Sequence, residues 1–201
     1  MASSLQLTEL EHDLLVELFN IGVGRAADSL SQIVSQEIEL SVPYIEHVSV
    51  IELSERLDQG EDICSVSQTM AGNFEANTIL LFPQNSSMEV VSKMLGDGFS
   101  TETLAELHQE GFSEIGNVVL NACIGSFAES IEEVFDVGLP VYRIGSSTQV
   151  IETGDLNEIL FIRINLVLST SHVEGYLVFL LEHFSFEKLK ASLNKIIHGL
   201  S

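Results

Sequence analysis

Residues 13–20 read Asp-Leu-Leu-Val-Glu-Leu-Phe-Asn, and residues 110–117 read Glu-Gly-Phe-Ser-Glu-Ile-Gly-Asn. In each stretch a glutamate follows an acid by four residues, and an asparagine follows the glutamate by three. The two stretches start 97 residues apart in a chain of 201 residues. Apolar residues recur between the polar ones at a spacing of three or four, which is typical of an amphipathic helix. The chain is therefore expected to contain two similar helices.

The polar residues of the first stretch share one side of its helix. Successive helical residues turn by about 100°, so Asp13, Glu17 and Asn20 lie on one narrow stripe. The opposite side is apolar and is expected to be buried; it carries Leu14, Leu15, Leu18 and Ile21. The second copy has Glu110, Glu114 and Asn117 on its stripe, and Phe112, Ile115, Val118 and Val119 opposite. We expect both stripes to face solvent.

The match between the two halves extends beyond the stripes. The chain has three prolines, and two of them, Pro43 and Pro140, are separated by the same offset of 97 residues. We interpret the chain as a single domain, residues 1–201, made of two repeats at about 7–96 and 101–201. A turn at Gly96-Asp97-Gly98 is the expected boundary between them. The two matched prolines are interpreted as structural, at the passage from helix to strand.

The hydrophobic pattern predicts the same order of elements in both repeats. The first is expected to contain a helical region, three strands and a short helix, at residues 9–35, 45–53, 63–70, 74–82 and 87–95. The second is expected to repeat this order at residues 103–135, 148–152, 158–168, 173–181 and 186–197. Thr8 and Glu11 have the spacing of a capping box. Gly22 and Gly24 indicate either a phosphate-cradling turn or a break at which the first two helices, before and after the glycines, cross closely or bend.

Composition excludes several classes of function. The formal net charge is −22, with eight Lys and Arg residues against 30 Asp and Glu. Nucleic acids and anionic membrane surfaces are poor partners for such a chain, because they are bound through clustered cations. Cys64 and Cys123 do not have the spacing of metal ligands, so no metal site is predicted. Residues 1–7 do not resemble a secretion leader and no apolar run could span a bilayer, so a cytoplasmic location is expected.

The stripe combines two kinds of polar group with different chemistry. Carboxylates four residues apart on a helix repel each other, and a cation from a partner would relieve that repulsion. An amide both donates and accepts hydrogen bonds, so it can hold a water molecule in a fixed orientation. Phosphoryl transfer depends on such positioning and on electrostatics. A single stripe of this kind is most often only a solvated helix face, but its duplication favours a functional surface.

The spacing of the acid, glutamate, asparagine and proline, in both copies, resembles the signature of the CheC/CheX/FliY family of chemotaxis phosphatases. The run Asn20-Ile21-Gly22-Val23-Gly24 and the residues up to Ser31 also resemble CheC. The family pattern usually has Asp or Ser where the second copy has Glu110. The resemblance implies an α/β (α+β) fold with internal duplication and pseudo-two-fold symmetry. In that fold, a mainly antiparallel sheet carries two exposed active-site helices.

The resemblance also implies an activity, hydrolysis of the aspartyl phosphate of the response regulator CheY. Asn20 and Asn117 would each orient the attacking water, and Glu17 and Glu114 would each anchor a lysine of the regulator. Asp13 and Glu110 would support the site. The chain itself would bind no cofactor, because the Mg²⁺ belongs to the regulator. The receptor deamidase CheD is a further partner that the resemblance suggests.

Two alternative functions are also compatible with the sequence. The chain could be a non-catalytic adaptor that binds CheY or CheD through the same surfaces. It could also be a carboxylate-based enzyme acting on a small molecule, such as a glycosidase. That second alternative needs a deep pocket between paired acids, and the chain offers no Trp as a sugar platform.

Overall fold

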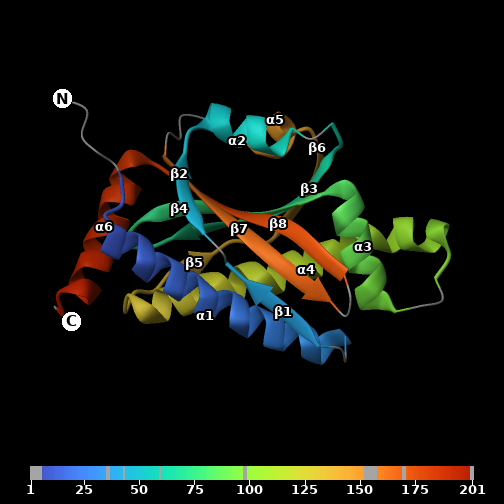
Figure 1. Cartoon of the computed structure of the whole chain (residues 1–201), viewed down its shortest axis with the longest axis horizontal. Coiled ribbons are helices and arrows are strands. Elements are labelled where there is room, and N and C mark those ends of the chain that lie inside the picture. Colours follow the sequence, from blue (N-terminus) through green and yellow to red (C-terminus); the bar gives the residue numbers. More distant parts are fainter. Residues whose placement is uncertain are drawn as a thin grey trace.

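The structure is a computed structural model (Figure 1), which describes residues 6–34, 37–42, 44–58, 60–96, 99–151, 158–168 and 171–199. The helices are α1 Glu9–Val34, α2 Val50–Leu57, α3 Gln84–Leu95, α4 Thr101–Ser130, α5 Ser147–Val150 and α6 His183–Ile197. The strands are β1 Ile38–Ser41, β2 Ile45–Val48, β3 Ile63–Ala71, β4 Glu75–Pro83, β5 Asp136–Val137, β6 Val141–Gly145, β7 Glu158–Leu168 and β8 Ser171–Leu181. The order helix, two strands, helix, two strands, helix thus occurs twice.

All strands join one antiparallel sheet in the order β1-β7-β8-β4-β3-β5, with β2 also pairing β7 and β6 also pairing β3. The first two strands of each half therefore pair with a long strand of the other half. At the centre β4 lies beside β8, where Ile79 faces Val178 and Leu80 faces Leu177. Because of this exchange, neither half completes its part of the sheet alone.

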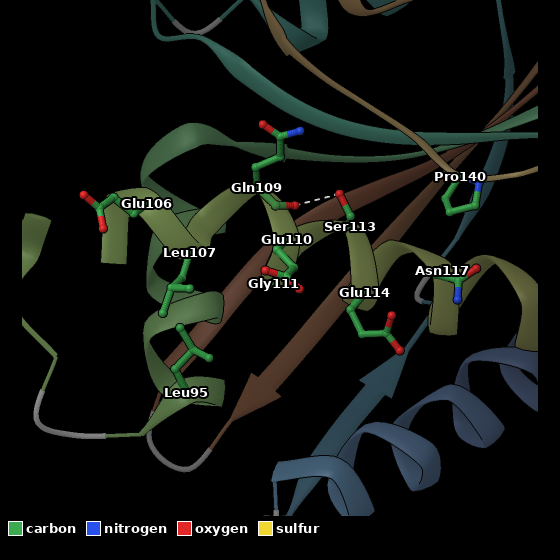
Figure 2. A pocket seen from close by; sticks show the side chains of 10 residues that line it. All are labelled: Leu95, Glu106, Leu107, Gln109, Glu110, Gly111, Ser113, Glu114, Asn117 and Pro140. Carbon is green, nitrogen blue, oxygen red and sulfur yellow. Dashed lines mark hydrogen bonds between the residues drawn. The ribbon is translucent and has the colours of Figure 1, made fainter. Parts of the chain in front are cut away.

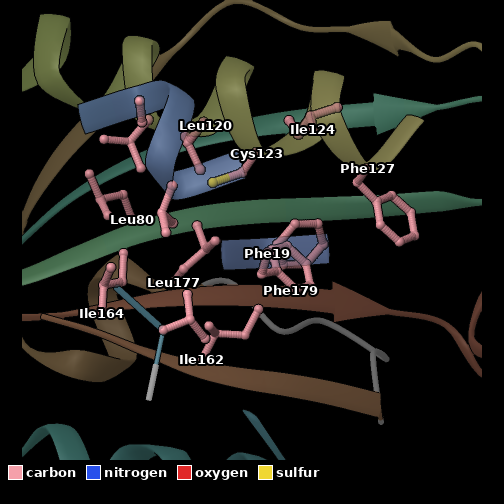
Figure 3. Close-up of a cluster of buried hydrophobic side chains, with 14 of the residues drawn as sticks. Phe19, Leu80, Leu120, Cys123, Ile124, Phe127, Ile162, Ile164, Leu177 and Phe179 are labelled. Atoms are coloured by element: carbon pink, nitrogen blue, oxygen red, sulfur yellow. The ribbon is translucent and has the colours of Figure 1, made fainter. Parts of the chain in front are cut away.

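The sheet separates two layers of helices (Figure 1). The long helices α1 and α4 cover one face, and the short helices α2 and α5 cover the other. Successive residues of a strand point to opposite faces, so Leu80 packs in the core under α1 and α4 while Ile79 and Leu81 pack under α2 and α5. The central strands are therefore apolar on both faces, as Figure 3 illustrates for the core on the α1 and α4 side.

The two long helices lie side by side and run in opposite directions (Figure 1). They are in close contact at Gly22, where an added Cβ would lie 2.8 Å from the Cα of Cys123. The rings of Phe19 and Phe127 stack between them with centroids 6.0 Å apart. Helix α1 is continuous through both glycines. The predicted break, with its turn or its crossing of two helices, is therefore wrong because the residues on both sides of the glycines form one helix; Gly22 instead lets α1 pack closely against α4.

The predicted fold class is confirmed: this is a mixed α/β molecule with an antiparallel sheet. The capping box is also confirmed, since Thr8 N donates to Glu11 Oε2 at 2.7 Å and Glu11 N donates to Thr8 Oγ1 at 3.3 Å. Several local predictions are wrong. The strand expected at residues 45–53 ends at Val48, because residues 50–53 belong to α2, and the helix expected to reach residue 135 ends at Ser130. Residues 147–150 form helix α5 and not a strand, and Ile21 is 40% exposed because it lies near the edge of the buried face of α1. Of the predicted boundary turn, residues 97 and 98 lie outside the described residues.

Candidate functional site

The second acid–acid–amide stripe lines a surface pocket. Figure 2 shows Glu110, Glu114 and Asn117 along one side of α4, with Pro140 facing Asn117 from the loop before β6. Both glutamates are exposed and the asparagine is half-buried. The pocket has a volume of about 830 Å³ and is open to solvent. The structure thus brings together the four residues of the second predicted motif.

The pocket is negatively charged. Glu106, Glu110 and Glu114 follow one another at one-turn intervals, and all three line it. The rest of the lining consists of Leu95, Leu107, Gln109, Gly111, Ser113, Asn117 and Pro140, so no Lys or Arg contributes. Three carboxylates without a cation attract a positively charged group from another molecule. The pocket is suited to an approaching lysine or arginine side chain.

The amide of Asn117 is held through its oxygen. Its Oδ1 accepts a hydrogen bond from Nδ2 of Asn121 at 2.8 Å and a longer one from Nε2 of Gln68 at 3.4 Å. Two donors use both lone pairs of an amide oxygen. No group among the described residues accepts a hydrogen bond from Nδ2 of Asn117. This asparagine therefore has a donor available at the pocket.

The amide of Asn20 is held in the opposite way. Its Nδ2 donates to Val16 O at 2.9 Å and to Val42 O at 3.2 Å, which uses both of its hydrogens. Its Oδ1 accepts from Val42 N at 2.9 Å and keeps one lone pair. Asn20 is half-buried, whereas Glu17 and Asp13 are exposed on the same side of α1. In this copy the asparagine holds the chain that follows β1.

The residues before the two motif prolines differ correspondingly. Val42 is 3% exposed, whereas Leu139, at the matching position, is 87% exposed. Pro140 is half-buried and lines the pocket; Pro43 lies outside the described residues. The first copy thus buries the residue before its proline against the helix asparagine, whereas the second leaves the side chain of Leu139 exposed beside the pocket.

Two residues of the second site were missed from the sequence. Asn121 could have been noticed in the sequence, because the matching position in the first repeat is Gly24 and the polar residue therefore occurs only in the second copy. Nothing in the sequence pointed to Gln68, since only the pairing of strands brings β3 beneath α4. Within the described ranges, no group of three or more His, Cys, Asp or Glu residues could hold a metal ion. None of the helices in those ranges is long and apolar enough to cross a membrane.

Comparisons with known proteins identify relatives of the whole chain by sequence. No family model matches the chain. It is 23% identical to the CheY-P phosphatase CheC of Bacillus subtilis over 199 residues, which is 93% of this chain and 95% of CheC. It is 25% identical to the flagellar motor switch phosphatase FliY of Bacillus subtilis over 131 residues, 64% of this chain and 33% of FliY.

Solved structures show the same fold. FliY of Thermotoga maritima superposes with a TM-score of 0.75 at 19% identity, covering 94% of this chain and 98% of that one. CheX in the CheX-CheY-BeF3-Mg²⁺ complex of Borrelia burgdorferi superposes with a TM-score of 0.52 at 17% identity, covering 84% and 98%. These likenesses show that the chain has the fold of FliY and CheX. The chain is homologous to CheC and FliY of Bacillus subtilis and structurally close to FliY of Thermotoga maritima, which supports the resemblance to the CheC/CheX/FliY family.

Proposed function

We propose that the chain hydrolyses the aspartyl phosphate of a phosphorylated response regulator of the CheY type. The observation that carries this proposal is the pocket on α4, where uncompensated carboxylates stand next to an amide donor. Glu114 would anchor a lysine of the regulator, and Glu110 would add to the negative potential. Asn117 would reach the phosphoryl group and hold the attacking water. The relatives' activity as CheY-P phosphatases supports this reading.

The chemistry requires only positioning from this chain. Water attacks phosphorus in line with the acyl oxygen, the bond between phosphorus and the aspartyl oxygen breaks, and inorganic phosphate and a free aspartate result. The oxygen of the water forms the new bond to phosphorus, and the proton that it loses is taken up by an oxygen of the phosphate or by solvent. The regulator's Mg²⁺ would neutralise charge on the phosphoryl oxygens. The amide of Asn117 would orient the water, and such orientation can contribute several kcal/mol to lowering the barrier.

The first copy is proposed as a second site of the same kind, with Glu17 as anchor, Asn20 as the amide and Asp13 in support. In the structure both hydrogens of Asn20 Nδ2 are donated to the backbone. The side chain would have to leave Val42 before it could act on a phosphoryl group. We therefore assign most of the turnover to Asn117. The recurring element order supports our proposal that the two sites belong to repeats 7–96 and 101–201.

An adaptor role is a second candidate for the first copy. The same backbone contacts of Asn20 favour it, because they leave exposed Glu17 and Asp13 as a binding surface without a free amide donor. CheY or CheD would be the protein bound there.

Loss of phosphate from phosphorylated CheY, followed with and without the purified chain, tests the function. The chain is expected to accelerate the loss, and the double variant Asn20→Ala, Asn117→Ala is expected to be inactive. Full activity of the double variant would disprove the mechanism. An inactive parent that still binds CheY, with binding unaffected by the two substitutions, would support the adaptor role.

A further inference from the structure

We propose that Gln68 is a positioning residue that, together with Asn121, fixes which end of the Asn117 amide faces the partner. This inference rests on the proposed function and adds a residue that lies outside the motif, on a strand of the other half of the chain. It concerns the second site alone.

Gln68 is a polar residue in an apolar place. Its side chain is 3% exposed and lies on β3 beneath α4, on the face where Val66 and Met70 contribute to the core. Its Nε2 lies between two acceptors, Asn117 Oδ1 at 3.4 Å and Gly138 O at 3.1 Å. The reverse amide orientation would place an oxygen against both acceptors. The contacts therefore define the orientation of Gln68 as a double donor.

This arrangement costs stability, because Oε1 of Gln68 is buried and has no hydrogen-bond partner in the described part of the chain. An unpaired buried acceptor costs about 1–3 kcal/mol. The fold does not require a polar side chain here. The residues that precede the two motif prolines identify the matching position in the other half of the sheet. If the β3–β5 pairing is continued by two residues, Gln68 lies opposite Leu139. If the β1–β7 pairing is continued by one residue, Ile164 lies opposite Val42. The other half of the sheet thus has an isoleucine where this half has Gln68.

The contact has a direct consequence for Asn117. With Gln68 and Asn121 both donating to Oδ1, rotating the amide by 180° would bring Nδ2 against two donors. The Nδ2 end is therefore fixed toward the pocket. In the first copy Gly24 and Ile164 occupy the matching positions, neither side chain can donate a hydrogen bond, and Asn20 there donates to the backbone instead. The partners of the asparagine thus decide which end of its amide each site presents.

The test uses an Asn20→Ala background, in which turnover of phosphorylated CheY comes from the second site. Gln68→Met keeps the volume and removes the donor. We expect kcat to fall about tenfold to a hundredfold, as for a misplaced catalytic group. Affinity for CheY activated with beryllofluoride, which involves the exposed glutamates, is expected to change less than about twofold. In NMR spectra the side-chain NH₂ resonances of Asn117 should shift.

Thr78→Val is the matched control, because Thr78 Oγ1 donates to the backbone O of Gln68 and does not contact Asn117. It alters the same part of the sheet and should leave kcat unchanged. Asn121→Ala provides a second test from an exposed position that cannot affect folding through burial. Asn121→Ala should also lower kcat, as Gln68→Met does.

The outcomes separate the inference from the function beneath it. If Gln68→Met and Asn121→Ala both retain kcat while Asn117→Ala abolishes turnover, the positioning role is wrong and the phosphatase site stands. The same conclusion follows if Thr78→Val lowers kcat as much as Gln68→Met, since the effect would then come from the sheet. If Asn117→Ala itself retains turnover in this background, the proposed function fails.

Discussion

The side chain of Asn20 and the backbone of Val42 exchange two hydrogen bonds, one in each direction, at 2.9 and 3.2 Å. This is the pattern that two residues of neighbouring antiparallel strands make with each other. It ties the segment after β1 to helix α1 and accompanies the burial of Val42. The asparagine of the second motif makes no such contact with the backbone of Leu139, so the two motifs combine structural and chemical roles in different proportions.

Asn20→Ala is therefore expected to lower mainly the stability of the protein, and Asn117→Ala mainly its turnover. Asn20→Ala leaves the N–H and C=O of buried Val42 without partners and should cost about 1–3 kcal/mol in the free energy of unfolding. Asn117→Ala should cost less than about 1 kcal/mol, because Gln68 Nε2 keeps its bond to Gly138 O. Turnover of phosphorylated CheY should fall about a hundredfold with Asn117→Ala and less than about twofold with Asn20→Ala. Urea unfolding and phosphate release on the same preparations measure both quantities. Equal losses of turnover in the two variants would contradict this assignment.

The residues that precede the motif prolines provide a second contrast. Val42→Ala removes buried methyl groups and should lower the free energy of unfolding by about 1.5–3 kcal/mol. Leu139→Ala alters an exposed side chain and should change it by less than about 0.5 kcal/mol. Because Leu139 lies beside the pocket, its substitution should raise KM for phosphorylated CheY and leave kcat unchanged. A stability loss for Leu139→Ala similar to that for Val42→Ala would mean that the side chain of Leu139 packs against the protein.

The two glycines of α1 give a matched pair for stability. Gly22→Ala places a Cβ 2.8 Å from the Cα of Cys123, so the backbones of α1 and α4 must separate. This overpacking should cost about 1–3 kcal/mol. Gly24→Ala meets nothing within 4 Å and should stabilise the helix by about 0.5–1 kcal/mol. Urea unfolding of both variants checks the opposite signs. Stabilisation by Gly22→Ala would show that the helices are not in contact at this residue.

The fold was predictable from the sequence where periodicity is strong. The strand at residues 158–168 was predicted with the bounds of β7, because apolar residues form an almost continuous run there, interrupted only by Arg163 and Asn165. The two-residue strand β5 and the four-residue helix α5 are too short to leave a periodic signal. Pairing between the halves could not be predicted, since it depends on which sheet edge each short strand reaches.

The stripes of the site were likewise predictable from helical spacing, but the states of their amides were not. Asn20 and Asn117 have the same neighbours in the motif, yet their hydrogen bonds come from Val42 in one copy and from Gln68 in the other. Those contacts depend on where a loop and a distant strand lie. A local motif cannot specify them.

His108 provides a prediction about pH. It lies on α4 behind the pocket and is 6% exposed, with Nε2 within 2.9 Å of Ser87 Oγ and its ring stacked on Phe112. Burial lowers the pKa of His108 below its usual value of 6.5. As the pH falls through 6.5, the unfolded chain therefore takes up a proton at this residue before the folded chain does. The free energy of unfolding should therefore decrease as the pH falls from 6.5 to the lowered pKa of the folded chain. Below that pKa, His108 should cause no further decrease.

The substitution His108→Gln removes this titration while keeping a polar group beside Ser87. Urea unfolding from about pH 7.5 to about pH 5.5 should give a flatter dependence for His108→Gln than for the parent, whatever the difference in their absolute stabilities. Parallel curves for the parent and His108→Gln would show that His108 takes up protons equally well in the folded and unfolded chain, in conflict with its burial against Phe112.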